Sequence, residues 1–394
     1  MAEINSTVFN ESTPDFLLSS KFPHGSDWPV VYILDNDQEA TIITHEAYVG
    51  ETLDASVRAS QHWQNPERRR LTRINLISDV DYNKSVILDL EAFLIKHMSV
   101  DRHFKLQNGN MGLHLHNYFN RAYYEGTFRL IWEQLRERKL ADKDLQEIEN
   151  SDLFKYSPFN SLSADQYNAI ACVVKDLSAA IQAKQPMTAI VEGGPGTGKT
   201  VLAVQMMKLL TARNLGIIQE PDAEEESSTL VESLKELPKG LKVGLVIPMQ
   251  SLRQTIQSVF DSIGGGLGAK MVLSPNDVPK QTFDLLIVDE AHRLRQRKGL
   301  AQYPVFDQNN ALLGFGNEGT ELDWILKQSK YQLFFYDGMQ SVKPADVDAS
   351  RFVALKQGAH SKIYKLHTQF RCRAGDDYIK YVRSILSYNP PAEA

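Results

Sequence analysis

A glycine-rich stretch near the middle of the chain has the residue types needed to hold a phosphate group. It consists of Gly193, Gly194, Pro195, Gly196, Thr197, Gly198, Lys199 and Thr200. These residues match the P-loop pattern in full, and the apolar segment before them and the amphipathic one after them indicate a strand-to-helix turn. Glycines let backbone N–H groups turn toward phosphate oxygens, and the start of the helix adds a favourable dipole. We expect the stretch to bind ATP, with Lys199 on the β- and γ-phosphates and the Thr200 hydroxyl on Mg²⁺.

A pair of acidic residues follows a second apolar run. Residues 285–288 read Leu-Leu-Ile-Val, and Asp289 and Glu290 come directly after them. The apolar run predicts a buried strand, so both carboxylates emerge at its carboxyl end, beside the glycine-rich loop. An acid in this place completes the Mg²⁺ shell, and a second acid orients or deprotonates the attacking water. The sequence thus predicts a metal ligand at Asp289 and a catalytic carboxylate at Glu290.

Four further segments stand in order around the loop, at residues 162–166, 247–252, 337–341 and 366–371. In this order they resemble motifs of the superfamily 1 helicases. The resemblance implies that Gln166 reads the edge of adenine, that Gln340 couples the γ-phosphate to the bound strand, and that Arg371 acts as an arginine finger. It also implies that residues 247–252 contact the nucleic-acid backbone.

Three segments are similar to one branch of that superfamily. Asp-Glu-Ala-His at 289–292, Asp-Gly-Met-Gln at 337–340 and Phe-Arg-Cys-Arg at 370–373 together resemble the Schlafen-type, group 3-like helicases, over about residues 160–390. A helicase of this class continues through most of a second RecA-like domain. We expect only the start of that domain here, at 346–394, so that it looks truncated. The resemblance therefore implies ATP binding rather than complete helicase activity.

The N-terminal third holds a second set of residues suited to phosphate chemistry. Tyr32 lies in an apolar strand pattern, and Tyr48 begins the run Tyr48-Val49-Gly50. Arg58 and His62 follow at a spacing of four, which places both on one face of a helix. A later apolar helical pattern, residues 86–98, contains one glutamate, Glu91.

This set resembles the GIY-YIG endonucleases, in which two tyrosines flank a hairpin, an arginine lies on the next helix and a later glutamate binds one divalent metal. The resemblance implies that Glu91 binds Mg²⁺ or Mn²⁺. It implies that the catalytic residues are Tyr32, Tyr48, Arg58, His62, Glu91 and Asn108. Asn110 is close enough in the sequence to take the place of Asn108.

Hydrolysis of a phosphodiester needs an activated water, stabilisation of charge at phosphorus, and help for the leaving oxygen. A metal on Glu91 would stabilise the leaving group, and Arg58 would stabilise the developing negative charge. Tyr32 would serve as general base if its neighbours polarise the phenol.

Other residues of this region have two interpretations. The basic cluster Arg68, Arg69, Arg70 and Arg73 fits contacts to substrate phosphates, but it equally fits a solvated turn. Tyrosines are ordinary residues of strands, and a lone glutamate in an apolar helix is often a satisfied polar residue. His45, His62, His114 and His116 could indicate a metal site, but lone histidines more often pack or face solvent.

The order of elements predicts an α/β protein. Strands are expected at 30–34, 188–192, 243–248, 285–289, 332–336 and 362–366, with Thr52 capping the helix that carries Arg58. From about residue 160 strands and helices alternate, which is typical of a parallel sheet. The expected domains are a flexible leader at 1–26, a GIY-YIG-like domain at 27–125, a helical linker at 126–150, a RecA-like P-loop domain at 151–345 with an acidic insertion at about 218–240, and the start of the second RecA-like domain.

Composition narrows the class of protein. A length of 394 residues predicts about two or three domains. The net charge of −6 does not indicate a nucleic-acid binder, although charge is unevenly distributed along the chain. Cys172 and Cys372 are too few for a disulfide framework. No apolar run is long enough to span a bilayer and the N-terminus does not read as a secretory signal, so we expect a cytoplasmic protein.

Together these features predict an ATP-dependent enzyme that remodels DNA and cuts it with Mg²⁺ or Mn²⁺, in repair, restriction or defence. One alternative is an ATPase stimulated by DNA or RNA whose N-terminal domain only binds nucleic acid. Another is a nucleotide-dependent switch that acts on proteins. RNA as the substrate stays open, and protein partners are unknown.

Overall fold

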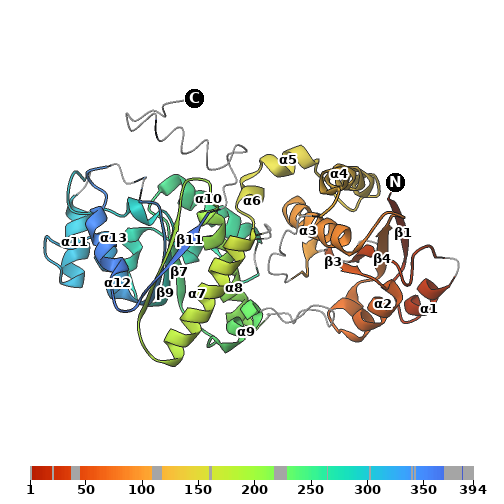
Figure 1. Cartoon of the computed structure of the whole chain (residues 1–394), viewed down its shortest axis with the longest axis horizontal. Helices are drawn as coiled ribbons and strands as arrows, with labels where there is room; N and C mark the ends of the chain where they lie inside the picture. Colours follow the sequence, from red (N-terminus) through yellow and green to blue (C-terminus); the bar gives the residue numbers. More distant parts are fainter. Residues whose placement is uncertain are drawn as a thin grey trace. The chain divides into compact units, whose positions relative to one another are not determined.

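The structure is a computed structural model, in which two compact units divide the chain at Ser161 and Leu162 (Figure 1). The described residues are 2–19, 22–36, 45–108, 118–158, 162–216, 229–263, 265–300, 303–338, 340, 343–367 and 384. Among them, no helix combines the length and apolar character needed to cross a membrane.

The first unit is built on a five-stranded sheet in the order β1-β4-β2-β3-β5. The strands are β1 (Glu3–Val8), β2 (Val30–Asp35), β3 (Glu46–Thr52), β4 (Arg73–Ser78) and β5 (Lys105–Leu106). All neighbours are antiparallel except β3 and β5. All six residues of β2 are buried, because this strand lies at the centre of the sheet and both of its faces are covered.

Helices cover the two faces of this sheet, and alternate residues of β2 serve each face. Tyr32 and Leu34 pack with residues of α1 (Thr13–Leu18) and α2 (Ala55–Gln64). Val31 and Ile33 pack with α3 (Lys84–Asp101) and α4 (Arg121–Glu137). The remaining helices are η1 (Arg68–Arg70), α5 (Leu145–Asn150) and α6 (Asp152–Lys155). The cap of α2 is Asp54, whose side chain accepts a hydrogen bond from the Val57 N–H, and not Thr52 as expected.

The ends of this unit correct two expectations. Residues 3–8, expected to belong to a flexible leader, form β1 and pair along their whole length with β4. Residues 126–150, expected to be a linker, include most of α4, whose Phe128, Ile131 and Trp132 lie in the core. Both segments are therefore parts of the folded unit, which extends to about residue 161.

The second unit contains a fully parallel six-stranded sheet in the order β11-β6-β10-β9-β7-β8. Its strands are β6 (Met187–Gly193), β7 (Val243–Val246), β8 (Val272–Leu273), β9 (Phe283–Val288), β10 (Ser329–Tyr336) and β11 (Ser361–Leu366). The five strands expected in this part of the chain are confirmed, together with the mixed α/β class. β8 was not expected, because two residues are too few to make a pattern.

Helices lie on both sides of this sheet (Figure 1). The longer ones are α7 (Ala164–Gln182), α8 (Lys199–Leu215), α9 (Thr229–Glu236), α10 (Gln250–Ile263), α11 (Tyr303–Leu313), α12 (Glu321–Gln328) and α13 (Ala349–Lys356). Short 3₁₀ turns complete the set: η2 (Ala269–Met271), η3 (Pro275–Lys280) and η4 (Ala291–Arg293). Residues of α11, α12 and α13 share one core with alternate residues of β6, β9 and β10.

The last strand corrects a third expectation. Residues 346–394 were expected to begin a second domain, yet β11 pairs in parallel with β6 at the edge of the P-loop sheet. The described part of this segment thus belongs to the same sheet as the glycine-rich loop. Residues 217–228, which include about half of the expected acidic insertion at 218–240, lie outside the described residues.

Candidate functional site

The glycine-rich loop joins the end of β6 to the start of α8. Gly196 and Gly198 have φ values of 82° and 80°. Residues other than glycine rarely adopt this backbone conformation. The local sequence is therefore needed to make the turn, and it leaves the first N–H groups of α8 directed out of the helix end. Such a loop is suited to bind an anion.

Lys199, the first residue of α8, is held inside this loop. Its ammonium donates hydrogen bonds to the carbonyls of Gly193 and Gly194, both at 2.8 Å. It also lies 3.5 Å from the Asp337 carboxylate. The side chain is only 6 % exposed. The loop thus contains a buried positive charge at its centre.

Gln166 supports the loop from α7. Its side-chain amide donates to the Thr197 carbonyl at 2.9 Å, and its oxygen accepts from the Ser163 N–H at 3.0 Å. Thr197 in turn donates its hydroxyl to the Gly194 carbonyl. Gln166 is buried with both ends of its amide bonded to the protein. The structure therefore places it as a support of the loop, rather than with its amide directed outward to read a base.

Asp289 follows β9 and is fully buried. Within the described ranges, neither of its carboxylate oxygens has a hydrogen-bonding partner. Burial raises its pKa to about 6, and the neighbouring Glu290 carboxylate adds to the rise. The Thr200 hydroxyl and the Lys199 ammonium act in the opposite direction, so both lie near this carboxylate.

A divalent cation fits these residues. A buried carboxylate without protein partners is unfavourable, and a hard cation would satisfy its oxygens. The Thr200 hydroxyl offers a second oxygen beside it. Asp289 and Thr200 are therefore the residues that would hold Mg²⁺.

Glu290 has a strained backbone and an ionised side chain. Its φ is 52°, in the left-handed region, which costs a non-glycine residue about 1–2 kcal/mol. Its carboxylate accepts from the Arg293 guanidinium at 3.2 Å and lies 3.0 Å from the His292 imidazole. Burial alone would raise the pKa of Glu290, but His292 and Arg293 outweigh it and hold the pKa below the usual value. This carboxylate is therefore available as a proton acceptor at neutral pH.

Asp337 is a member of this site that the sequence analysis did not single out. It follows β10, which lies between β6 and β9, so its buried carboxylate reaches Lys199. Gln340 donates its side-chain amide to the same carboxylate at 2.7 Å, so this predicted residue does lie at the site. The position of Asp337 directly after a strand was the signal that could have identified it. Arg371 lies outside the described residues.

The first unit brings its own predicted residues together. The Tyr32 hydroxyl lies 2.7 Å from Nε2 of His62 and accepts a hydrogen bond from Nε of Arg58 at 3.1 Å. The Tyr48 ring lies 5.1 Å from the His62 ring and 6.2 Å from the Tyr32 ring, measured between centroids. We call Tyr32, Tyr48, Arg58 and His62 the tyrosine cluster.

Gly50 makes the tyrosine cluster possible. A Cβ atom at this position would lie 2.3 Å from the Tyr32 hydroxyl and 3.0 Å from the Tyr48 ring. Gly50 is opposite Tyr32 in the β2–β3 pairing. Only a residue without a side chain lets the phenol cross its neighbouring strand.

Burial sets the protonation states in the cluster. It raises the pKa of Tyr32 and of Tyr48, with nearby negative charges adding to both shifts. It lowers the pKa of His62 to about 3, with Arg58 and Arg68 adding to that shift. At neutral pH both phenols keep their protons, and His62 is a neutral imidazole that can accept a hydrogen bond.

Glu91 and Asn108 occupy different surroundings. Glu91 is buried on α3, and its charge raises the pKa of both tyrosines, which places it near the cluster. Asn108 instead pairs with the backbone of Val49: its oxygen accepts from the N–H at 2.9 Å and its amide donates to the carbonyl at 2.6 Å. Asn108 therefore fixes strand β3, and its predicted catalytic role has no support in this arrangement. Asn110, His114 and His116 lie outside the described residues.

The basic cluster separates into different environments. Arg68 is buried, with its guanidinium 3.9 Å above the Tyr48 ring and hydrogen bonded to the Gln107 side chain. Arg73 forms an ion pair with Asp35 at 2.8 Å. Arg69 and Arg70 are exposed. The four arginines thus do not form one surface for phosphates, and Arg68 belongs beside the tyrosine cluster.

Comparisons with known proteins match the second unit. The family model for the Schlafen group 3 DNA/RNA helicase domain matches residues 186–393, which is more than half of the chain. No curated protein matches.

Solved structures of two kinds are similar to this chain. A structure of two coordinating Pif1 helicases at forked double-stranded DNA is 12 % identical in sequence, with a TM-score of 0.26. The match covers 56 % of this chain and 48 % of the helicase chain. A Bacteroides Pif1 bound to single-stranded DNA has 12 % identity and a TM-score of 0.25, with 56 % and 47 % covered. A DNA replication initiation factor has 14 % identity and a TM-score of 0.24, with 61 % and 56 % covered.

The chain spans about half the length of these structures. Residues 186–393, which the family model matches, include the glycine-rich loop, Asp289, Glu290 and Asp337. The chain belongs to the Schlafen group 3 DNA/RNA helicase domain family.

Proposed function

We propose that this chain is an ATP-dependent nucleic-acid enzyme, in which a superfamily 1 helicase-type ATPase is joined to a metal-dependent endonuclease of the GIY-YIG kind. DNA is the proposed substrate. The ATPase occupies the second unit and the nuclease the first. The observation that carries the nuclease half is the buried contact of Tyr32 with both His62 and Arg58.

The ATPase half is supported by the residues around Lys199. Bound nucleotide would replace the carbonyls of Gly193 and Gly194 as partners of the Lys199 ammonium. A magnesium ion on Asp289 and Thr200 would neutralise charge on the β- and γ-phosphates. The ionised Glu290 would take a proton from the attacking water.

The nuclease half is supported by the direction of hydrogen bonding in the tyrosine cluster. Arg58 donates to the Tyr32 oxygen, so the phenol proton is free to point at Nε2 of the neutral His62. The negative charge of a bound phosphate would raise the pKa of His62 from its low value. A water beside Tyr32 would then lose its proton to the phenol oxygen while the phenol proton passes to His62. The hydroxide would attack phosphorus, and the bond from phosphorus to the leaving oxygen would break. Arg58 would stabilise the charge that develops on the phosphate.

A divalent metal on Glu91 would stabilise the leaving oxygen. Among the described residues, no group of three His, Cys, Asp or Glu side chains could hold a metal ion. A metal there would therefore rely on Glu91, waters and phosphate oxygens, a shell that Mg²⁺ commonly has.

The test is cleavage of labelled single- and double-stranded DNA with Mg²⁺ or Mn²⁺, with and without ATP. We expect Glu91→Gln to abolish cutting and to keep ATP turnover, and Lys199→Ala to abolish turnover and to keep metal-dependent cutting. Unchanged cutting by Glu91→Gln would show that the first unit is not the nuclease. An ATPase that neither DNA nor RNA stimulates would favour a switch that acts on proteins.

A further inference from the structure

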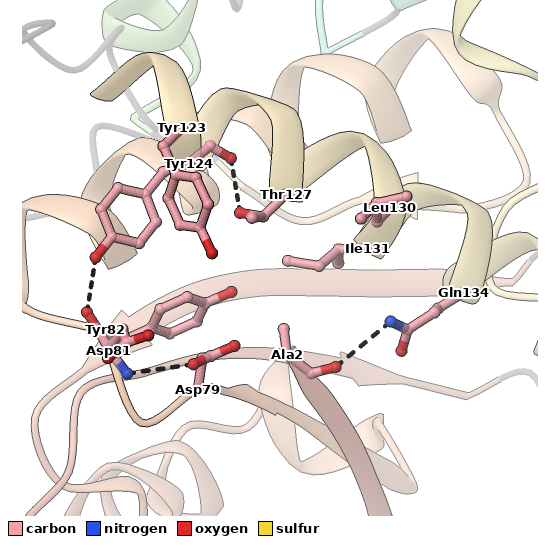
Figure 2. Close-up of a pocket in the computed structure, with 10 residues that line it drawn as sticks. All are labelled: Ala2, Asp79, Asp81, Tyr82, Tyr123, Tyr124, Thr127, Leu130, Ile131 and Gln134. Atoms are coloured by element: carbon pink, nitrogen blue, oxygen red, sulfur yellow. Dashed lines mark hydrogen bonds between the residues drawn. The ribbon is translucent and has the colours of Figure 1, made fainter. Parts of the chain in front are cut away.

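The first unit has a pocket that lies apart from the tyrosine cluster. The N-terminal end of β1, the turn that follows β4 and one side of α4 form its walls (Figure 2). The space between these walls is about 420 Å³ when the open solvent at its mouth is included. Its lining residues Tyr82 and Ile131 belong to the core that contains Val31 and Ile33, whereas Tyr32 and Tyr48 belong to the core on the other face of the sheet.

Tyr82 directs an unused polar group into this pocket. The residue is 7 % exposed, and its hydroxyl has no hydrogen-bonding partner in the described part of the chain. Figure 2 shows the phenol oxygen pointing toward the middle of the pocket. A buried hydroxyl without a partner is unfavourable. A ligand that supplies a hydrogen bond at this point would remove that cost.

The pocket combines negative charge with aromatic rings. Asp79 and Asp81 are among its lining residues, and so are Tyr82, Tyr123 and Tyr124. The Asp79 carboxylate accepts a hydrogen bond from the Asp81 N–H at 3.2 Å. The Tyr124 hydroxyl donates to the Asp81 carbonyl at 3.0 Å, which ties α4 to the turn that follows β4. Carboxylates with aromatic faces attract cations, and they repel the phosphates of a nucleic acid.

The rim of the pocket is apolar and exposed. Of the lining residues, Tyr123 is 64 % exposed and Leu130 is 52 % exposed, and both lie on α4. Large apolar side chains grouped around a polar pocket are typical of a site for a protein partner. A polyamine or a free cation would leave these apolar side chains exposed to solvent.

We propose that this pocket binds an arginine side chain of a partner protein, from a segment in which apolar residues flank the arginine. The planar guanidinium has five donors, enough to serve the two carboxylates and the Tyr82 oxygen together. Its face can stack on a tyrosine ring. The flanking apolar residues would cover Tyr123 and Leu130.

The test uses the full chain and the peptide Gly-Leu-Arg-Leu-Gly, with binding measured by calorimetry. A second peptide carries citrulline, which has the shape of arginine without its charge, and should bind at least tenfold more weakly. Asp79→Asn and Tyr82→Phe should each weaken binding of the arginine peptide about tenfold. Glu137→Gln, which removes one charge from α4 outside the pocket, should leave binding unchanged.

Thermal unfolding separates this role from a merely structural one. Tyr82→Phe should not lower the melting temperature, because it removes a hydroxyl that makes no hydrogen bond. Equal binding of the arginine and citrulline peptides, or full binding by Tyr82→Phe, would overturn the proposal. So would equal binding of a peptide with glycine in place of both leucines, or displacement of the arginine peptide by equimolar spermidine.

Discussion

Asp289 and Glu290 are neighbours in the chain, yet their surroundings shift their pKa values in opposite directions. The buried carboxylate of Asp289 has no hydrogen-bonding partner among the described residues, and its pKa is raised to about 6. Glu290 faces His292 and Arg293, and its pKa is lowered. Two acids that differ in this way can hold different roles, one as ligand and one as base.

Asp289 makes metal binding depend on pH. A metal must displace the proton, so affinity for Mn²⁺ should fall about tenfold for each pH unit below about 6 and change little between pH 7 and 8. Titration of Mn²⁺ at pH 5, 6, 7 and 8 in the presence of ATP measures this dependence. Asp289→Asn should bind weakly at every pH. A wild type with constant affinity from pH 5 to 8 would contradict the assignment.

Glu290→Gln should separate ATP binding from hydrolysis. The amide keeps the size of the side chain but cannot accept a proton, so turnover should fall at least about 100-fold while ATP still binds. Turnover and nucleotide affinity are measured on the same preparation. The control is Glu318→Gln, an exposed acid, which should behave like the wild type. Wild-type turnover in the Glu290 variant would remove this residue from the mechanism.

At the scale of elements, the sequence predicted strands whose residues are apolar and missed those defined by their partners. Residues 285–288 of β9 and 333–336 of β10 are continuous apolar runs that are fully buried, so their patterns identify these strands. β1 reads Glu-Ile-Asn-Ser-Thr-Val and buries only Ile4. It becomes a strand because β4, about 70 residues away, pairs with it. A local pattern contains no information about such a pairing.

The same reason explains which site residues could be predicted. The P-loop residues are close in sequence, so spacing alone places them. Asp337 reaches Lys199 only because β10 lies beside β6. Asn108 was expected in catalysis, but it bonds to the backbone of a strand about 60 residues away. The residue types indicated that these side chains could form hydrogen bonds or ion pairs. Their actual partners depend on how the strands pair, which the sequence does not show.

Gly50→Ala should disrupt the tyrosine cluster. The added methyl would lie 2.3 Å from the Tyr32 hydroxyl, so the phenol must move away from His62. We expect loss of cutting and a destabilisation of about 1–3 kcal/mol, with ATP turnover unchanged. DNA cleavage and thermal unfolding measure both effects.

Gly126→Ala is the matched control for this change. Gly126 lies in α4, and a Cβ added there meets no atom within 4 Å. The replacement should stabilise the helix by up to about 1 kcal/mol and preserve cutting. If Gly50→Ala also kept full cutting, the close approach at Gly50 would have no part in the function.

At the scale of the whole molecule, two units with separate sheets and cores should respond separately to ligand. Mg-ATP at 100 times its dissociation constant should stabilise the second unit by about 2.7 kcal/mol. Calorimetry should then show one transition that moves up by several degrees and one that stays in place. Lys199→Ala should abolish the shift, and Gly50→Ala should lower only the transition that ATP leaves unchanged. Movement of both transitions with ATP would show that the two units unfold together.

The left-handed backbone of Glu290 has a consequence for evolution in the laboratory. Glycine adopts this conformation without strain, so Glu290→Gly should relieve about 1 kcal/mol. A selection for heat resistance alone would therefore favour glycine at a position where the ATPase needs a carboxylate. The variants that survive best would be the ones that no longer turn over, so stability and activity oppose one another at this residue. Heat-resistant forms of this protein are best sought at positions away from the turn after β9.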